Sequence, residues 1–161
     1  MSEHDSEHRT VTLTREFDAP IDLVYRAWAE PEHVTRWMKC DVQAALEVEN
    51  WVPAAGTEFR THMSQPGVFE TRGTGRFTHV DPPNLLAWVT DADPKLGVPE
   101  MSVRVELKDL GGKTELTLTQ SGIPNDMICG VIKGGWTASM TQLQTVVDDL
   151  LGADARAERL P

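Results

Sequence analysis

The clearest indication of the fold comes from Met101-Ser-Val-Arg-Val-Glu-Leu-Lys108, which is followed by Gly111-Gly112 and Glu115-Leu-Thr-Leu-Thr119. Apolar and polar residues alternate on both sides of the glycine pair, with the period of two expected of half-buried strands. Two such strands joined by a glycine-rich turn form an antiparallel hairpin. The stretch therefore predicts a hairpin with one apolar face.

A long amphipathic helix is predicted directly after this hairpin. Beyond Gly122, apolar residues recur at helical spacing from Met127 to Leu151. Gly134-Gly135 interrupts the pattern, which predicts either a bend or close packing at that point. Gly152 suits the end of the helix, so residues 153–161 are expected to form a polar tail.

Upstream of the hairpin, the periodicity predicts further strands and two short helices. Alternation at 11–17 predicts a first strand, and the two helices are expected at 20–28 and 32–38, each near a proline. Four more strands are predicted over 42–49, 58–63, 68–80 and 85–90. Gly73 and Gly75 lie inside the third of these, where glycine indicates a bulge or a bend.

This order of elements predicts an α+β helix-grip fold. A curved antiparallel sheet of six to seven strands wraps round the long C-terminal helix, and the two short helices follow the first strand. The length of 161 residues suits one domain. We expect a disordered tail at 1–8, the domain at 9–152 and the polar tail at 153–161.

Composition and charge limit the compartment and the partners. No apolar run approaches the roughly 20 residues that span a bilayer, and the polar first residues do not form an export signal. Cys40 and Cys129 are expected to be reduced thiols, so we predict a cytoplasmic protein. The formal net charge of −10 would repel nucleic acid and anionic membranes, and neither is expected as a partner.

Several short strings resemble one known family. They are Phe17–Trp28, Glu30–Trp37, Gly75–Phe77 with Val80–Pro83, and Ser121–Pro124 followed by Gly135-Trp136 and Leu143. In this order they resemble the AHSA-type family, named after activators of the Hsp90 ATPase, over roughly residues 10–151. The resemblance implies the START-like (SRPBCC) fold, which is also the fold of the birch-pollen allergen. Proteins with this fold include lipid carriers, hormone receptors and polyketide cyclases.

The sequence also departs from this family. The co-chaperones carry a separate N-terminal domain with an Asn- and Trp-rich motif, and Asn50-Trp51 is too short a match to replace it. A chaperone partner is therefore not expected. Many relatives have an acid at the position of His79 and a histidine at the position of Gln120, so the roles of those groups do not carry over.

Isolated polar residues are the only candidates for chemistry. No nucleophile, phosphate-loop, dinucleotide or zinc motif is present, so neither a cofactor nor a metal is expected. His33, His62 and His79 are interpreted as surface or packing residues. Gln120 faces inward, where a structural hydrogen bond to a neighbouring backbone group is favoured over a ligand contact. For inward-facing Arg15, a salt bridge at the sheet rim is favoured over a ligand carboxylate.

The strongest constellation is a set of mostly apolar residues on the predicted inner faces. These candidate ligand-binding residues are Trp37, Met38, Phe59, Met63, Phe69, Phe77, Trp88, Met101, Val103, Gln120, Met127, Val131 and Trp136. Aromatic rings and flexible methionines suit an adaptable pocket for a hydrophobic or aromatic ligand. The alternative is that they fill a solid core.

Three functions follow as hypotheses. The favoured one is a non-catalytic protein that binds a small hydrophobic molecule between the sheet and the long helix. The second is an enzyme resembling polyketide cyclases, with Arg15, His62 and Gln120 as its candidate polar groups. The third is a stress-related module that interacts with a chaperone. A homodimer could form through an exposed sheet face or edge.

Overall fold

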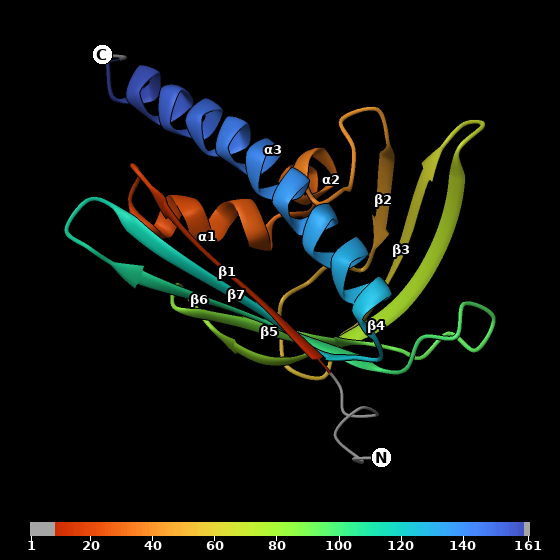
Figure 1. Cartoon of the computed structure of the whole chain (residues 1–161). Helices are drawn as coiled ribbons and strands as arrows, with labels where there is room; N and C mark the ends of the chain where they lie inside the picture. The colour runs from red at the N-terminus through yellow and green to blue at the C-terminus, as the bar shows by residue number, and fades with distance from the viewer. Residues whose placement is uncertain (1–8, 160–161) are drawn as a thin grey trace.

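The computed structural model describes residues 9–159, which form a seven-stranded antiparallel sheet and three helices (Figure 1). The elements, in chain order, are β1 (Arg9–Phe17), α1 (Ile21–Ala29), α2 (Pro31–Trp37), β2 (Ala45–Glu49), β3 (Glu58–Gln65), β4 (Phe69–Asp81), β5 (Leu85–Thr90), β6 (Met101–Asp109), β7 (Thr114–Ile123) and α3 (Asp126–Arg159). The predicted α+β helix-grip order is confirmed.

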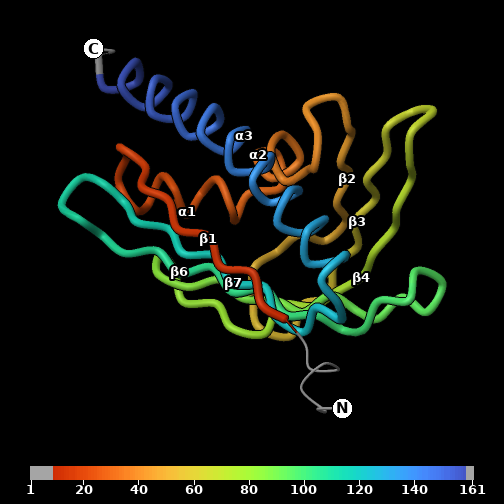
Figure 2. The backbone as a smooth tube through the Cα atoms, in the orientation of Figure 1, coloured from red at the N-terminus to blue at the C-terminus, as the bar shows by residue number. Residues whose placement is uncertain are grey.

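The sheet order is β1-β7-β6-β5-β4-β3-β2, so β2 to β7 form a meander and β1 pairs beside its last strand. In the β6–β7 hairpin, Val105 lies opposite Leu118, and both side chains are buried. Because β1 and β2 occupy opposite edges of the sheet, α1 and α2 carry the chain from one edge to the other (Figure 2).

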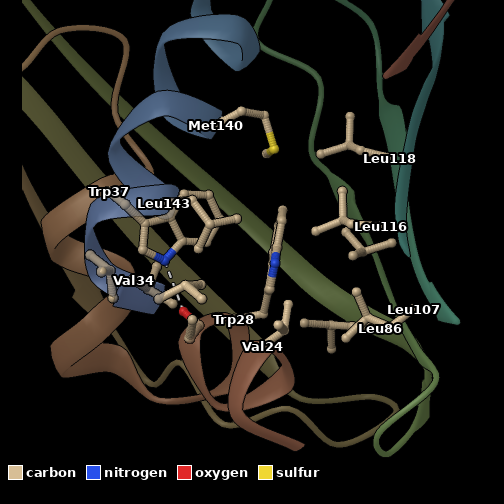
Figure 3. Close-up of a cluster of buried hydrophobic side chains, with 14 of the residues drawn as sticks. Val24, Trp28, Val34, Trp37, Leu86, Leu107, Leu116, Leu118, Met140 and Leu143 are labelled. Atoms are coloured by element: carbon tan, nitrogen blue, oxygen red, sulfur yellow. Dashed lines mark hydrogen bonds between the residues drawn. The ribbon is translucent and has the colours of Figure 1, made fainter. Parts of the chain in front are cut away.

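The sheet curves, and α3 crosses its concave side (Figures 1 and 2). Leu116 and Leu118 of β7 face Met140 and Leu143 of α3, with the ring of Trp28 from α1 between them (Figure 3). Fully burying one such side chain contributes about 1.5–3 kcal/mol. The apolar stripe of α3 and the inner face of the hairpin therefore cover each other, as the sequence predicts.

Tryptophan side chains connect the short helices to this core. The indole N–H of Trp37 donates to the carbonyl of Ala27 at 2.8 Å, and that of Trp51 donates to the carbonyl of Trp28 at 2.9 Å. Within residues 9–159, the buried indole N–H of Trp28 itself has no hydrogen-bond partner. These bonds fix α1, α2 and the loop after β2 relative to one another.

The structure changes two predictions about α3. The helix continues past Gly152 to Arg159, so the predicted end of the helix is wrong. Alanines 153, 155 and 157 are strong helix formers, and they outweigh the cost of a single glycine. The helix also continues through Gly134-Gly135, where a Cβ at Gly135 would make an ordinary van der Waals contact with Cys40 Cβ at 3.7 Å.

The predicted division into a tail, a domain and a second tail stays a prediction, and residues 1–8 lie outside the described part of the chain. Within residues 9–159, no helix combines the length and the apolar character that crossing a bilayer requires. Cys40 and Cys129 are both free thiols.

Candidate functional site

A cavity of about 280 Å³ lies between the first half of α3, the segment after α2 and the inner face of the sheet. Four aromatic side chains contribute to its wall: Trp51, Phe59, Trp88 and Trp136. The methionines 38 and 63 also line it. Thr71, Gly73 and Cys40 line the cavity and are exposed, so it opens to solvent beside the β3–β4 hairpin.

Gly73 of β4 lines this cavity, and Gly75 of the same strand packs under Phe59, which also lines it. Gly75 lies opposite Phe59, and Gly73 lies opposite Thr61. A Cβ at Gly75 would lie 2.6 Å from Cζ of Phe59, so the ring occupies the space above this glycine. The ring of Phe59 thus packs directly on the backbone of Gly75. Gly73, two residues earlier on the same face, has no side chain to fill the space beside it. The irregularity of β4 lies further on, between Phe77 and His79.

Gln120 connects the sheet to α3 at the cavity wall. Its side chain is buried, and its Oε1 accepts a hydrogen bond of 2.6 Å from the indole N–H of Trp136. Its Nε2 donates to Sδ of Met101 at 3.5 Å. The structural bond expected for this amide is therefore present, although its partners are side chains and not backbone groups.

The segment after α2 is held against α3 by one backbone carbonyl. Oγ of Ser139 and Nε2 of Gln142 each donate to the carbonyl of Lys39 at 2.9 Å. Sγ of the neighbouring Cys40 lies 3.7 Å from Sδ of Met63 on β3. These contacts position the two residues that form the rim of the cavity on this side.

The lining of the cavity is almost free of charge. Among its described residues, Lys39 alone carries a charged side chain, and no Asp, Glu, Arg or His takes part. Nζ of Lys39 has one long contact, 3.4 Å from the carbonyl of Val42. An apolar cavity with a few hydroxyl and amide groups suits the binding of an uncharged apolar molecule.

The predicted inner-face residues separate into two groups. Seven of the thirteen line the cavity: Met38, Phe59, Met63, Trp88, Val103, Gln120 and Trp136. Trp37 and Phe77 are fully buried in the core instead, and Phe69 lies at the start of β4. Met101 lies outside the lining, against the amide of Gln120.

The predicted facing is wrong for the two remaining residues, both on α3. Met127 is 76% exposed and Val131 is 70% exposed. The inward face of this helix instead passes through Ile132, Trp136 and Ser139. Apolar residues occur on both sides of the first turns of α3, so periodicity alone could not distinguish the faces.

The predicted set omits several other lining residues, among them Trp51, Thr61 and Ile132. Ile132 lies one helical turn before Trp136, so a helical phase anchored on that tryptophan would have found it. Thr61 lies between Phe59 and Met63 on the inward face of β3, where the alternation already indicated it. Trp51 follows the end of β2 and belongs to no periodic element, so no signal pointed to it.

The candidate acid–base residues do not converge on the cavity. The guanidinium of Arg15 lies 6.0 Å from the centre of the Phe17 ring, and within residues 9–159 it forms no ion pair, so the predicted rim salt bridge is wrong. Nε2 of His62 lies 2.7 Å from a carboxylate oxygen of Glu70. Neither side chain lines the cavity that contains Gln120.

The other two histidines within residues 9–159 lie away from the cavity as well. His79 is exposed on β4, and Nε2 of His33 lies 2.9 Å from a carboxylate oxygen of Glu30. Together with Glu32, these last two residues could supply three metal ligands within 4.8 Å of one another. Exposed acidic groups of this kind are common without a metal, and the pair between His33 and Glu30 already satisfies the ring nitrogen.

A curved antiparallel sheet that grips a long helix over an apolar cavity defines the START-like class of proteins. A family model described as "Activator of Hsp90 ATPase homolog 1-like protein" matches residues 18–148. The chain belongs to this family. A search of curated protein sequences found no match.

Solved structures support the fold. A crystal structure of a protein from Chromobacterium violaceum has 22% sequence identity and a TM-score of 0.76, covering 86% of this chain and 96% of its own. One from Nitrosomonas europaea has 22% identity and a TM-score of 0.74, covering 87% and 94%. CalU16 from Micromonospora echinospora has 20% identity and a TM-score of 0.65, covering 87% and 76%. At these identities the likeness concerns the fold alone.

Proposed function

We propose that this protein binds a small hydrophobic or aromatic molecule in the cavity between the sheet and α3, without catalysing a reaction. The observation that carries the proposal is the lining: four aromatic rings and two methionines surround about 280 Å³, and Lys39 is the one charged residue among the lining residues that the structure describes. Ligand pockets are mostly apolar with a few placed polar groups, and this composition fits that description.

The size of the cavity sets the expected affinity. Burying about 300 Å² of apolar ligand surface contributes about 7.5 kcal/mol at 25 cal/mol/Å², before the cost of immobilising the ligand. A dissociation constant of roughly 1 μM corresponds to about 8 kcal/mol. Because the cost of immobilisation is subtracted from this gain, we expect a ligand of two or three fused or linked rings to bind with a dissociation constant weaker than about 1 μM.

Catalysis has less support than binding alone. Acid–base chemistry requires a titratable group within hydrogen-bond reach of the substrate. Of the three candidate groups, Arg15 and His62 lie outside the lining, and Gln120 is neither an acid nor a base. The lining residues Lys39 and Cys40 lie at the rim of the cavity. Interaction with a chaperone rests on the family description alone.

The test uses the fluorescent probe N-phenyl-1-naphthylamine and two phenylalanine variants of neighbouring β4 residues. Gly73→Phe places a ring in the cavity, because Gly73 lines it opposite Thr61. Arg72→Phe adds the same ring at the adjacent exposed position, outside the lining. We expect the wild type and Arg72→Phe to bind the probe equally, and Gly73→Phe to bind at least tenfold more weakly.

Thermal unfolding of both variants in the absence of probe checks that they fold. If the wild type does not bind the probe, or if Gly73→Phe binds it as well as Arg72→Phe does, the cavity is not the binding site and the proposal is wrong.

A further inference from the structure

The contact with Trp136 fixes the orientation of the buried Gln120 amide. An indole N–H can only donate a hydrogen bond. The 2.6 Å contact between Nε1 of Trp136 and the Gln120 side chain therefore requires the amide oxygen at that position. The NH₂ group of Gln120 must point the other way, so the polarity of this amide within the cavity wall is determined.

The NH₂ group has more donor capacity than the protein uses. It carries two hydrogens, and its one contact is with Sδ of Met101 at 3.5 Å. A thioether sulfur is a weak acceptor. No other acceptor within residues 9–159 lies in hydrogen-bond range of this nitrogen, although the side chain is only 7% exposed. A buried donor without a good acceptor is costly, so a ligand that supplies one gains affinity.

The hydroxyl groups near the cavity differ from Gln120, because several already donate within the protein. Ser139 donates to the carbonyl of Lys39, and Thr90 donates to that of Met101. The hydroxyl of Thr74 donates to a carboxylate oxygen of Asp91. Gln120 is therefore a buried lining residue with donor capacity that no strong acceptor within residues 9–159 takes up.

We propose that the ligand carries an uncharged hydrogen-bond acceptor, such as a ketone or ester carbonyl, that binds the NH₂ group of Gln120. Gln120 is then a specificity-determining residue, and this inference rests on the proposed binding function. An ionised carboxylate fits less well, because no cationic group in the described lining lies at Gln120 to offset the loss of hydration. The apolar remainder of the ligand packs against the aromatic walls.

Two ligands of similar shape test the inference: 2-acetylnaphthalene and 2-isopropylnaphthalene, in which a methyl group replaces the carbonyl oxygen. Their dissociation constants are measured by displacement of N-phenyl-1-naphthylamine from the wild type and from Gln120→Met. We expect the ratio of the two dissociation constants to differ by about fivefold or more between the wild type and the variant, which is the change in affinity expected from the loss of one hydrogen bond. Binding of 2-isopropylnaphthalene should change by less than about twofold.

A spectroscopic measurement separates this role from a structural one, because Gln120→Met also removes the bond to Trp136. The carbonyl ¹³C resonance of labelled 2-acetylnaphthalene moves downfield when the oxygen accepts a hydrogen bond. In the wild type it should lie downfield of its position in a hydrocarbon solvent, and in Gln120→Met it should return toward that position.

The outcomes distinguish this inference from the proposed function. If 2-isopropylnaphthalene binds the wild type but the ratio is the same in both proteins, the inference is overturned and the binding function stands. A wild-type carbonyl resonance at its hydrocarbon position overturns it too, even if the variant does not fold. If neither compound nor the probe binds, both proposals are wrong.

Discussion

Gly75 and Gly73 lie two positions apart on the same face of β4, and their surroundings differ. A Cβ at Gly75 would lie 2.3 Å from the carbonyl oxygen of Val89, which is backbone and cannot move away easily. At Gly73, the nearest atom is Oγ1 of Thr61 at 3.1 Å, at the end of a side chain. One glycine is required by packing, whereas the other leaves space in the cavity.

We predict that Gly75→Ala lowers the free energy of unfolding by about 1–3 kcal/mol, the usual cost of overpacking. Gly73→Ala should change it by less than about 1 kcal/mol, because alanine is a better strand residue and Thr61 can adjust. Urea denaturation of both variants measures the difference. Equal stability of the two would show that β4 can shift away from Val89.

Tyr25 provides a second prediction at this scale. Burial raises the pKa of its phenol above the ordinary value of 10.0, and the nearby carboxylate of Asp81 raises it further. The unfolded chain therefore loses this proton at lower pH than the folded one does. As the pH rises through 10.0, the free energy of unfolding should fall, and Tyr25→Phe should remove that part of the decrease.

Because Tyr25 is the one tyrosine in the sequence, ultraviolet difference absorbance follows its titration directly. Asp81→Asn should shift this titration toward lower pH without abolishing the effect of burial. An unchanged pH dependence of stability in Tyr25→Phe would contradict the assignment.

At the scale of elements, the carbonyl of Lys39 joins α2 to α3. Its two donors, Ser139 and Gln142, both come from α3. The double variant Ser139→Ala/Gln142→Ala leaves this acceptor without a protein partner, which should cost roughly 1–3 kcal/mol. We expect amide hydrogen exchange to accelerate over residues 38–42, at the rim of the cavity.

Thr141→Ala is the matched control for this variant. Its hydroxyl is exposed and donates only to the carbonyl of Thr137 within α3, at 3.3 Å. It should leave exchange at the rim unchanged. If the double variant and the control behave alike, the two bonds do not hold the segment.

The strands could be predicted well because side chains along a strand point alternately to its two faces, with a period of two. In β6 as far as Lys108, and in β7 as far as Gln120, side chains that face the core alternate with more exposed ones, as the sequence pattern predicts. The same rule found Phe59, Met63 and Val103 on the cavity wall. Once one residue of a strand is known to face inward, the others are determined.

Helices and loops were less predictable, for identifiable reasons. The first turns of α3 carry apolar residues on both faces, so Met127 and Val131 were placed inward although both are exposed. The glycine at 152 indicated an end, but the neighbouring alanines extend the helix. The bond between Gln120 and Trp136 joins two elements, and no pattern within either one specifies it.

At the scale of the whole molecule, the excess of acidic residues over basic ones, 25 against 15, opposes folding through repulsion between like charges. The ion pairs with α3, such as Arg36 with Asp149 at 2.6 Å, are half-exposed and contribute little. The screening length falls from about 10 Å at 0.1 M salt to about 3 Å at 1 M.

We therefore predict that the melting temperature rises when sodium chloride is increased from about 0.05 to about 0.5 M, because added salt weakens the net repulsion. Differential scanning calorimetry at constant pH measures the melting temperature at each salt concentration. A decrease instead would mean that the surface ion pairs outweigh the repulsion.

The five tryptophans of the chain form one connected group of rings. Trp28 lies at its centre, with ring centroids 4.4 Å from Trp37, 6.2 Å from Trp88 and 6.1 Å from Trp136, and Trp51 lies 5.4 Å from Trp88. At such separations, excitation passes between indoles before it is emitted. Intrinsic fluorescence therefore reports on the group as a unit. A single absorbing molecule bound in the cavity would quench the fluorescence of all five tryptophans together.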